Sequence, residues 1–267
     1  MKPLIFSSLF FIVAGILVSC QKVITVNLND VAKKYVIEGN ISNEPGICIV
    51  RITQTKNFTE NNDFPGVSGA TVAIADNGNP PVSLTETSPG FYTTDQLNGT
   101  PGHQYTMNVV INGESFSASS TMPSSVNLDS IFVEDKMIFG DSTRTVHVNY
   151  TDPDEKGNAY RFIQYRNNVQ EKDVFAINDD YTNGNAVSTQ LRTYDNSTDD
   201  IKLRSGDSVK VIMECIDTPV YLYWFSIDAA SGSSDSGTPA NPVSNITGNA
   251  LGYFSAHTTQ AKTIIAP

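Results

Sequence analysis

The sequence predicts a mainly β protein. We expect an N-terminal sandwich of immunoglobulin-like or transthyretin-like type, followed by a second β-rich domain with a short C-terminal helix. Runs rich in Val, Ile, Tyr and Phe recur roughly every 10–15 residues. Turn-forming Gly and Asn residues separate these runs, and no helical periodicity lies between the early ones. This spacing is typical of antiparallel sandwiches.

The first domain is expected at residues 31–122. Its strands are predicted at 34–38, 47–53, 70–75, 82–85, 91–93, 105–111 and 115–119. Asp76-Asn77-Gly78 is a turn signal, and Asn112-Gly113 favours a tight hairpin because Asn and Gly tolerate positive φ. Met122-Pro123-Ser124-Ser125 marks the boundary with the next domain.

The second domain is expected at residues 126–267. Its strands are predicted at 128–133, 143–150, 159–165 and 207–216, the last being the final clear strand. A long polar stretch separates the third of these strands from the fourth. A helix is predicted at 219–230, with Thr218 as its N-cap and Pro219 at its first position.

The N-terminus has the form of a bacterial secretory signal. Lys2 precedes an apolar run from Leu4 to Val18, which is too short for a membrane-spanning helix of ~20 residues. Leu17-Val18-Ser19-Cys20 resembles the lipobox of bacterial lipoproteins, in which the cysteine becomes the acylated first residue. We therefore expect a signal peptide at 1–19, and a tether at 20–30 whose Cys20 carries diacylglycerol and an N-acyl chain such as palmitate. The alternatives are an ordinary signal peptide or an uncleaved anchor.

Several segments together resemble a family of Bacteroidota lipoproteins, domain of unknown function 4249. They are residues 20–28, 35–42, 64–72, 89–92, 150–154, 206–211 and 241–256. The last segment, N-P-V-S-N-I-T-G-N-A-L-G-Y-F-S-A, is the most specific. The resemblance implies a cell-envelope lipoprotein, often encoded beside a TonB-dependent outer-membrane receptor, and it implies no catalytic residues.

The sorting signals after the lipobox leave the final location partly open. Gln21 stands where an aspartate would argue for retention in an inner membrane, so the outer membrane is expected. Gln21-Lys22-Val23 also lacks an acidic surface-export signal, so cell-surface and periplasmic display both remain open.

Charge and cysteine content restrict the partners further. The net charge is −11 and the pI is near 4.6, which disfavours nucleic acid as a partner. Cys48 and Cys215 lie within predicted strands and are interpreted as free, buried thiols; a disulfide between them is the alternative. The absence of a C-x-x-C pair gives no support for structural zinc.

No catalytic, metal or cofactor site is expected. His103, His147 and His257 are scattered, and no G-x-S-x-G, H-E-x-x-H or P-loop motif occurs. The segment 152–158 resembles a calcium loop but lacks its full spacing, so we interpret it as a turn. Asp179-Asp180 is a weaker candidate for a cation site or an acid–base pair.

Aromatic residues supply the candidate ligand-binding site. It consists of Tyr221, Tyr223, Trp224 and Tyr253, with Phe225 and Phe254 nearby. Aromatic faces stack on sugar or heme-like rings. The alternative is that these residues pack the helix onto the sheet. Ser130, Ser142 and Ser208 each follow an aspartate, in a weak pattern for O-glycosylation.

The sequence thus predicts a non-enzymatic, lipid-anchored outer-membrane accessory protein. Its expected role is ligand capture, or that of a lid, for a TonB-dependent nutrient transporter, with the membrane contacted through the lipid. The alternative is an adhesion or envelope-structural module of immunoglobulin-like domains with no small ligand.

Overall fold

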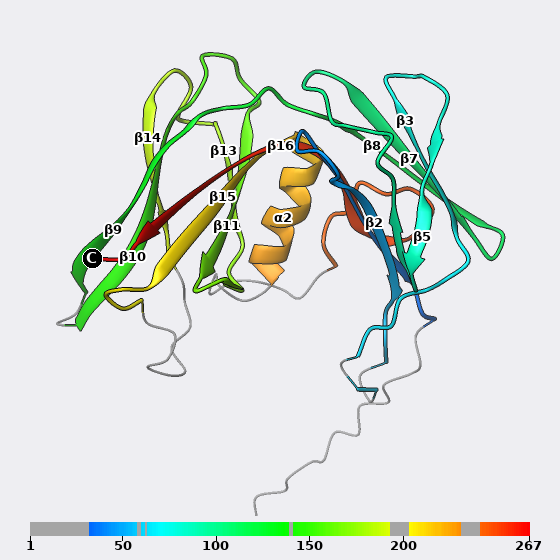
Figure 1. Cartoon of the computed structure of the whole chain (residues 1–267), viewed down its shortest axis with the longest axis horizontal. Helices are drawn as coiled ribbons and strands as arrows, with labels where there is room; N and C mark the ends of the chain where they lie inside the picture. The colour runs from blue at the N-terminus through cyan, green and yellow to red at the C-terminus, as the bar shows by residue number, and fades with distance from the viewer. Residues whose placement is uncertain (1–31, 58–59, 62, 139–140, 193–202, 231–240) are drawn as a thin grey trace, which may run out of the picture. The chain divides into compact units, whose positions relative to one another are not determined.

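A computed structural model describes residues 32–267 apart from 58–59, 62, 139–140, 193–202 and 231–240 (Figure 1). The segments Lys33–Lys56 and Glu60–Pro267 form one compact unit. Its regular structure consists of three β-sheets and, within the described part, a single helix, α2 (Thr218–Ala230). The mainly β class and the short helix predicted at 219–230 are therefore confirmed. Across the described residues, none of the helical structure is long and apolar enough to span a membrane.

The largest sheet has nine strands, in the order β12-β11-β15-β16-β1-β2-β6-β5, with β13 also paired to β11. The strands are β1 (Tyr35–Ser42), β2 (Cys48–Gln54), β5 (Thr85–Ser88), β6 (Phe91–Thr93), β11 (Ala159–Arg166), β12 (Val169–Gln170), β13 (Phe175–Asn178), β15 (Ser208–Ile216) and β16 (Leu251–Ile265). Strand β16 lies between β1 and β15 in this order, and Figure 1 shows its red C-terminal part beside β15.

Two smaller sheets pack against different parts of the large one. One contains β4 (Val82–Ser83), β3 (Thr71–Asp76), β7 (Gln104–Ile111) and β8 (Glu114–Thr121); the other contains β14 (Ala186–Leu191), β10 (Asp141–Thr151) and β9 (Leu128–Ile138). The first encloses a core that includes Ile37, Tyr105 and Phe254. The second encloses a separate core that includes Phe162 and Met213.

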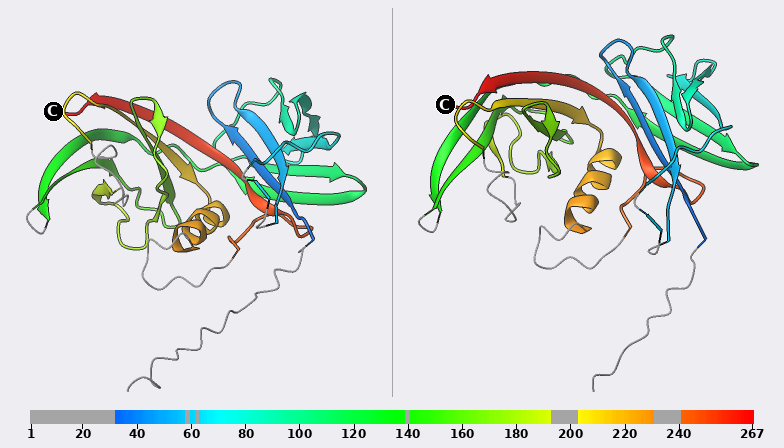
Figure 2. Two further views of the ribbon diagram at one scale, coloured as in Figure 1. Left: turned by 90° about the horizontal axis from the view of Figure 1, so that it is seen from below. Right: turned by 60° about the horizontal axis from the view of Figure 1, so that its bottom comes forward.

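The long strand β16 corrects the prediction that 207–216 holds the last strand. Residues 251–257 of β16 pair in parallel with β1, and residues 258–265 pair antiparallel with β15. Figure 2 shows β16 as a curved strand with α2 on its concave side. The close approach to β1 requires glycine at position 252: its φ is +100°, and a Cβ there would lie 2.0 Å from the Ile37 carbonyl oxygen.

The alternation of side chains explains why β16 is hard to recognise from sequence. Phe254 and Ala256 face the first core. Ser255 and His257, which alternate with these two residues along the strand, point to the opposite face and are also buried. A strand covered on both faces, with polar residues on one, lacks the apolar-in, polar-out pattern on which the prediction relied.

The turn predictions are confirmed, whereas the polar stretch contains an unpredicted strand. Asn112 and Gly113 have φ values of 49° and 83°, and they join β7 to β8 as a hairpin. Asn77 and Gly78 likewise have positive φ after β3.

The polar stretch at 178–200 contains β14, which pairs with β10 through polar and small residues.

The division into two domains at 122–126 remains a prediction. Met122 belongs to the first core and Val126 to the second, in agreement with that boundary. Ile246 and Phe254, which were assigned to the second domain, pack in the first core. The C-terminal segment therefore contributes to both halves.

Candidate binding site

Helix α2 is held at its start by Asp217, not by the predicted cap Thr218. Asp217 Oδ1 accepts from the Val220 backbone N–H at 3.2 Å, and the Asp217 carbonyl oxygen accepts from Tyr221 N–H at 2.9 Å. A carboxylate is a strong acceptor and interacts favourably with the helix dipole. Pro219 is the second helical residue, where a missing N–H costs nothing because that group has no intrahelical partner.

The same carboxylate connects the helix to the first sheet pair. Asp217 Oδ2 accepts from Ser120 Oγ and from Thr121 N–H of β8, both at 2.9 Å. Burial raises the pKa of Asp217, and these hydrogen bonds oppose that rise. The position of α2 is thus fixed by polar contacts at its first turn.

One face of the nine-stranded sheet carries a row of polar side chains across neighbouring strands. Arg161 of β11 lies opposite Glu214 of β15, so both side chains point to the same face. Their atoms Nη1 and Oε2 are 3.0 Å apart, and both side chains are largely buried. The other Glu214 oxygen, Oε1, lies 3.7 Å from His257 Nε2 of β16.

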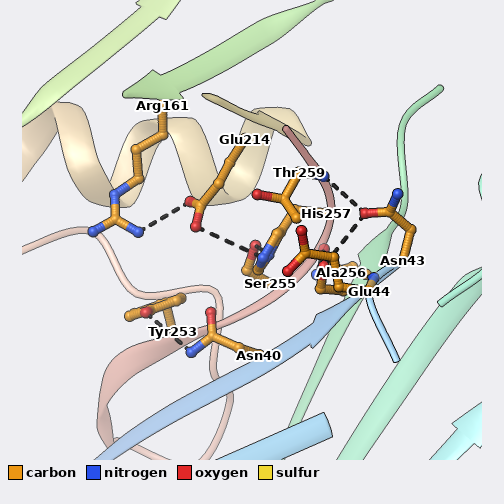
Figure 3. A network of polar contacts seen from close by, with 12 residues as sticks. Asn40, Asn43, Glu44, Arg161, Glu214, Tyr253, Ser255, Ala256, His257 and Thr259 are labelled. Atoms are coloured by element: carbon orange, nitrogen blue, oxygen red, sulfur yellow. Dashed lines mark hydrogen bonds and ion pairs between the residues drawn. The ribbon is translucent and has the colours of Figure 1, made fainter. Parts of the chain in front are cut away.

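Figure 3 shows this row extending to β1 and the loop after it. Tyr253 Oη accepts from Asn40 Nδ2 at 3.2 Å. Asn43 Oδ1 accepts from Thr259 N–H at 2.8 Å. Burial lowers the pKa of His257, although the Glu214 carboxylate opposes this. The imidazole is therefore neutral near pH 7, and Arg161 with Glu214 forms the charged pair.

Ser255, His257 and Glu214 have the connectivity of a hydrolytic relay without its accessibility. Ser255 Oγ lies 3.0 Å from His257 Nδ1, and His257 Nε2 faces Glu214. Ser255 is only 2% exposed and His257 5%. A nucleophile must reach its substrate, so in this conformation the three residues serve the packing of the sheet. The alternating polar residues at 253–259 were the sequence signal for this row, and the prediction missed it.

Three of the four predicted ligand-binding aromatics do come together. The ring centroids of Tyr223 and Tyr253 are 4.8 Å apart, and those of Trp224 and Tyr253 are 5.0 Å apart. The Arg161 guanidinium lies 3.5 Å from the Trp224 ring centroid. Tyr223 is 7% exposed and Tyr253 6%. Their faces cover one another, which is the packing alternative considered for these residues.

A cavity of about 290 Å³ lies on the outer side of Trp224. We call it the Trp224 cavity; its lining includes Arg161, Phe162, Gln170, Glu171, Lys172 and Trp224. Arg161 is paired with Glu214, and Glu171 is paired with Arg166 at 3.0 Å. Two of its charged side chains are therefore paired within the protein, whereas Lys172 has no partner among the described residues.

The fourth predicted aromatic, Tyr221, lies beside a different cavity, built by two loops and the start of α2. Asp179 Oδ2 accepts from the backbone N–H groups of Gly157 and Asn158 at 2.7 and 2.8 Å. Asp152 accepts from Thr182 Oγ1 at 2.8 Å and from the hydroxyl of Tyr160. These buried carboxylates join the loops at 152–158 and 179–185.

The carboxylates of these loops do not converge on a common point. Asp179 faces the 155–158 turn, whereas Asp180 Oδ2 accepts from Asn178 Nδ2 at 2.7 Å. Segment 152–158 is a turn, as interpreted from the sequence. Among the described residues, no three acidic, His or Cys side chains group as metal ligands.

The cavity that these loops enclose has a volume of about 380 Å³. We call it the Tyr221 cavity; its lining includes Lys156, Asn158, Asp180, Asn183, Tyr221 and Leu222. Lys156 makes no hydrogen bond or ion pair with any described residue, and the Tyr221 hydroxyl likewise has no partner there. Burial raises the pKa of Tyr221, and the nearby Asp180 carboxylate adds to this.

The remaining predicted positions lie apart from both cavities. Cys48 and Cys215 are free and buried, as interpreted from the sequence, and burial raises the pKa of Cys48 to about 12. Ser130 Oγ accepts from Asn149 Nδ2 at 3.0 Å. Ser208 begins β15 and Ser142 lies in β10. Cys20 lies outside the described residues.

The histidines lie on separate elements. His103 Nδ1 is 2.8 Å from Asp76 Oδ1, and the His147 ring stacks on Phe132 with centroids 4.9 Å apart. His257 belongs to the buried polar row. Each is a strand or turn residue that contacts its own neighbours, as the sequence interpretation holds.

Comparison with known families gives one match. The model of a domain of unknown function, DUF4249, matches residues 21–263. The chain belongs to this family, and the resemblance noted from its sequence segments is confirmed. A comparison with curated proteins gives no match.

Proposed function

We propose that this member of the DUF4249 family is a lipid-anchored ligand-capture subunit of a TonB-dependent nutrient transporter in the outer membrane. The observation that carries the proposal is the position of the lipobox. Leu17-Val18-Ser19-Cys20 ends immediately before Gln21, where the family match begins. The whole matched region, residues 21–263, would then be attached to the membrane through one acylated cysteine.

The physical chemistry of the anchor suits this role. Each buried methylene contributes ~0.8 kcal/mol, and stable attachment requires two acyl chains. A diacylglycerol with a further N-acyl chain meets this requirement without any membrane contact by the β-sheets. Anchoring beside a transporter also raises the effective concentration of a captured ligand at the transporter mouth, so modest affinity is sufficient.

The Tyr221 cavity supports capture rather than catalysis. Its volume lies within the ~300–1,000 Å³ typical of small-molecule sites. It combines an aromatic wall with polar groups that have no partner among the described residues. The arrangement Ser255–His257–Glu214, which has the connectivity of a catalytic relay, is buried, which favours a non-enzymatic role.

Acylation is tested by metabolic labelling with an alkyne-tagged palmitate in the native host. The wild type should incorporate label, and Cys20→Ala should not. Cys48→Ala is the matched control, because Cys48 is a buried strand residue and its replacement should leave labelling unchanged. Equal labelling of Cys20→Ala and wild type would exclude the anchor.

The transporter partnership is tested by extracting the native membrane in mild detergent and purifying the protein through an affinity tag. A large β-barrel receptor should co-purify with wild type at a constant ratio. Recovery of the protein alone, under conditions that preserve known outer-membrane complexes, would contradict the partnership.

A second candidate is an adhesion or envelope-structural module without a small ligand. The observation that favours it is the shared strand β16, which hydrogen-bonds to both β1 and β15 and so links the two cores directly. Thermal unfolding in the presence of nutrient mixtures separates the candidates. A ligand that binds the folded state raises the unfolding midpoint, whereas a purely structural module shows no shift.

A further inference from the structure

We infer that the Tyr221 cavity binds a neutral saccharide. This inference rests on the proposed capture function and names the chemical class of the ligand. It follows from two observations: some polar groups in the cavity wall have no hydrogen-bond partner among the described residues, and an apolar surface lies on one side of the cavity.

The apolar part of the cavity is one side of the helix α2. Tyr221 and Leu222 line it, and Leu222 is 43% exposed. The ring of Tyr221 is supported from behind by Phe225, with centroids 5.7 Å apart. An aromatic face of this kind packs against the C–H face of a sugar ring while its hydroxyl remains available for hydrogen bonding.

The polar part comes from the two loops. Lys156 supplies donors with no partner among the described residues. Asp180 uses one carboxylate oxygen for Asn178 Nδ2, and its other oxygen has no hydrogen-bond partner among the described residues. A sugar hydroxyl both donates and accepts, so it matches a wall that offers both kinds of group.

Asn183 holds the loop side of the cavity in place. It lines the cavity, and its Nδ2 donates to the Asp179 carbonyl at 2.9 Å, which fixes the amide orientation. Its Oδ1 is buried, with no hydrogen-bond partner among the described residues. Because a group the size of water does not reach that oxygen, we assign no ligand contact to it.

Tyr181 extends the apolar surface of the same loop. It lies between Asp180 and Asn183, and its side chain is 96% exposed. Tyr181 does not line the Tyr221 cavity, and a single exposed aromatic is normal on a protein surface, so the inference does not depend on it.

Charge argues for a neutral ligand. Lys156 and Asp180 carry opposite charges in the same lining, and the Asp179 carboxylate, which also lines it, is buried and accepts from the Gly157 and Asn158 N–H groups. A multiply charged anion would meet carboxylates, and a cation would meet the ammonium group. Of the side chains that ligate heme iron, the lining contains Tyr221 but no His, Cys or Met.

A third cavity carries no such inference. It is lined by Lys33, Gln54, Lys56 and Pro65, among others. Lys33 is paired with Glu60, and Lys56 donates to Asn61. The loop that borders this cavity includes residues 58–59 and 62, which lie outside the described part of the chain.

The test uses the full-length lipoprotein in mild detergent. Binding is measured against an immobilised panel of neutral, acidic and amino-sugar oligosaccharides, and by calorimetry against free amino acids and dipeptides. The variants are Tyr221→Ala and Asp180→Asn, which change exposed or partly exposed positions and should fold. Phe64→Ala and Asp129→Asn are matched controls, because both residues are exposed and lie outside the cavity.

The expected result is binding of at least one neutral oligosaccharide by wild type, weakened about tenfold or more in both cavity variants. Both controls should bind as wild type does. Binding that neither cavity variant weakens would overturn the inference, as would a preference for acidic glycans or an absence of glycan binding.

The outcomes separate this inference from the proposed function. Tyr221-dependent binding of amino acids or dipeptides, without saccharide binding, would refute the saccharide assignment and leave ligand capture standing. If no small molecule bound and no receptor co-purified, capture itself would fail. Saccharide binding without a co-purified receptor would retain the ligand class and refute the transporter partnership.

Discussion

The two cavities beside α2 differ in whether a cation of the protein covers their aromatic ring. In the Trp224 cavity, Arg161 lies over the tryptophan ring and is paired with Glu214, while Lys172 in the same lining has no partner among the described residues. In the Tyr221 cavity, Lys156 and the Tyr221 hydroxyl have no partner among the described residues. Aromatic content alone predicted Tyr221, Tyr223, Trp224 and Tyr253 together and did not distinguish between them. The comparison indicates that a ring left uncovered by the protein's own cation is the better criterion.

The largest expected effect is a difference in stability between variants of the two cavity cations, Arg161 and Lys156. Arg161→Met should destabilise the protein by about 3–5 kcal/mol, because it leaves the Glu214 carboxylate buried without its partner. Lys156→Met should change the unfolding free energy by no more than about 0.5 kcal/mol, because the side chain is exposed and unpaired. Urea unfolding of both variants measures the difference. Equal changes in unfolding free energy would contradict the view that Arg161 is paired in the protein and Lys156 is not.

The second prediction compares two tyrosines on the same helix. Tyr223→Ala should cost about 3 kcal/mol, because it removes a buried ring that contacts Trp224 and Tyr253. Tyr221→Ala should cost about 1 kcal/mol or less, because its ring is partly exposed at the cavity. Thermal or urea unfolding checks both values. A larger loss for Tyr221→Ala would show that Tyr221 is the packing residue.

The third prediction concerns the pH dependence of the buried polar row. The pKa of His257 is lowered in the folded state, so the unfolded chain binds the proton first as the pH falls. Stability should therefore fall as pH drops below the unfolded pKa of ~6.5 and continue to fall until the folded pKa is reached, by at most about 1.4 kcal/mol per pH unit.

This contribution is isolated with His257→Asn. Arg161, Glu214 and Glu44 are the charged groups around this imidazole, and the substitution retains all of them. The slope of unfolding free energy against pH between pH 7 and pH 5.5 should be shallower in the variant than in wild type. An identical slope would mean that His257 is protonated to the same extent in both states.

The smallest expected effect is chemical rather than energetic. Cys48 and Cys215 are buried and should not react with maleimide in the native state, because the thiolate is the reactive form and burial raises both pKa values. Leu222→Cys, at the Tyr221 cavity, should react rapidly. Val220→Cys, at a fully buried position two residues away, should not. Similar rates for the two variants would contradict an open cavity beside Tyr221.

Local patterns in the sequence were sufficient for the strands with simple alternation and for the helix. Tyr105 to Ile111 shows apolar and polar residues in turn and ends at Asn112-Gly113, so both the strand and its hairpin followed from sequence. Thr218 was the wrong cap because Asp217, one residue earlier, is an equally suitable capping residue by type, and residue type alone does not choose between them. The bonds of Asp217 to Ser120 and Thr121 are long-range contacts that no local pattern reveals.

The binding site shows the same limit. Tyr221 was identified from its residue type, but the loops that complete its cavity lie some way apart in the chain. They are joined by Asp179, which accepts from Gly157 and Asn158, and nothing in the local sequence specifies that pairing. The strand β16 was missed for a related reason: it is buried on both faces, with Phe254 and Ala256 in the first core and Ser255 and His257 in the polar row on the other face.

The most direct test of the central claim, that ligand is captured beside Tyr221 and not beside Trp224, is a crystal structure of the protein with a neutral oligosaccharide. The saccharide should lie in the Tyr221 cavity, with a sugar ring against Tyr221 and hydroxyl groups near Lys156 and Asp180. A saccharide bound instead against Trp224 and Arg161 would contradict the claim.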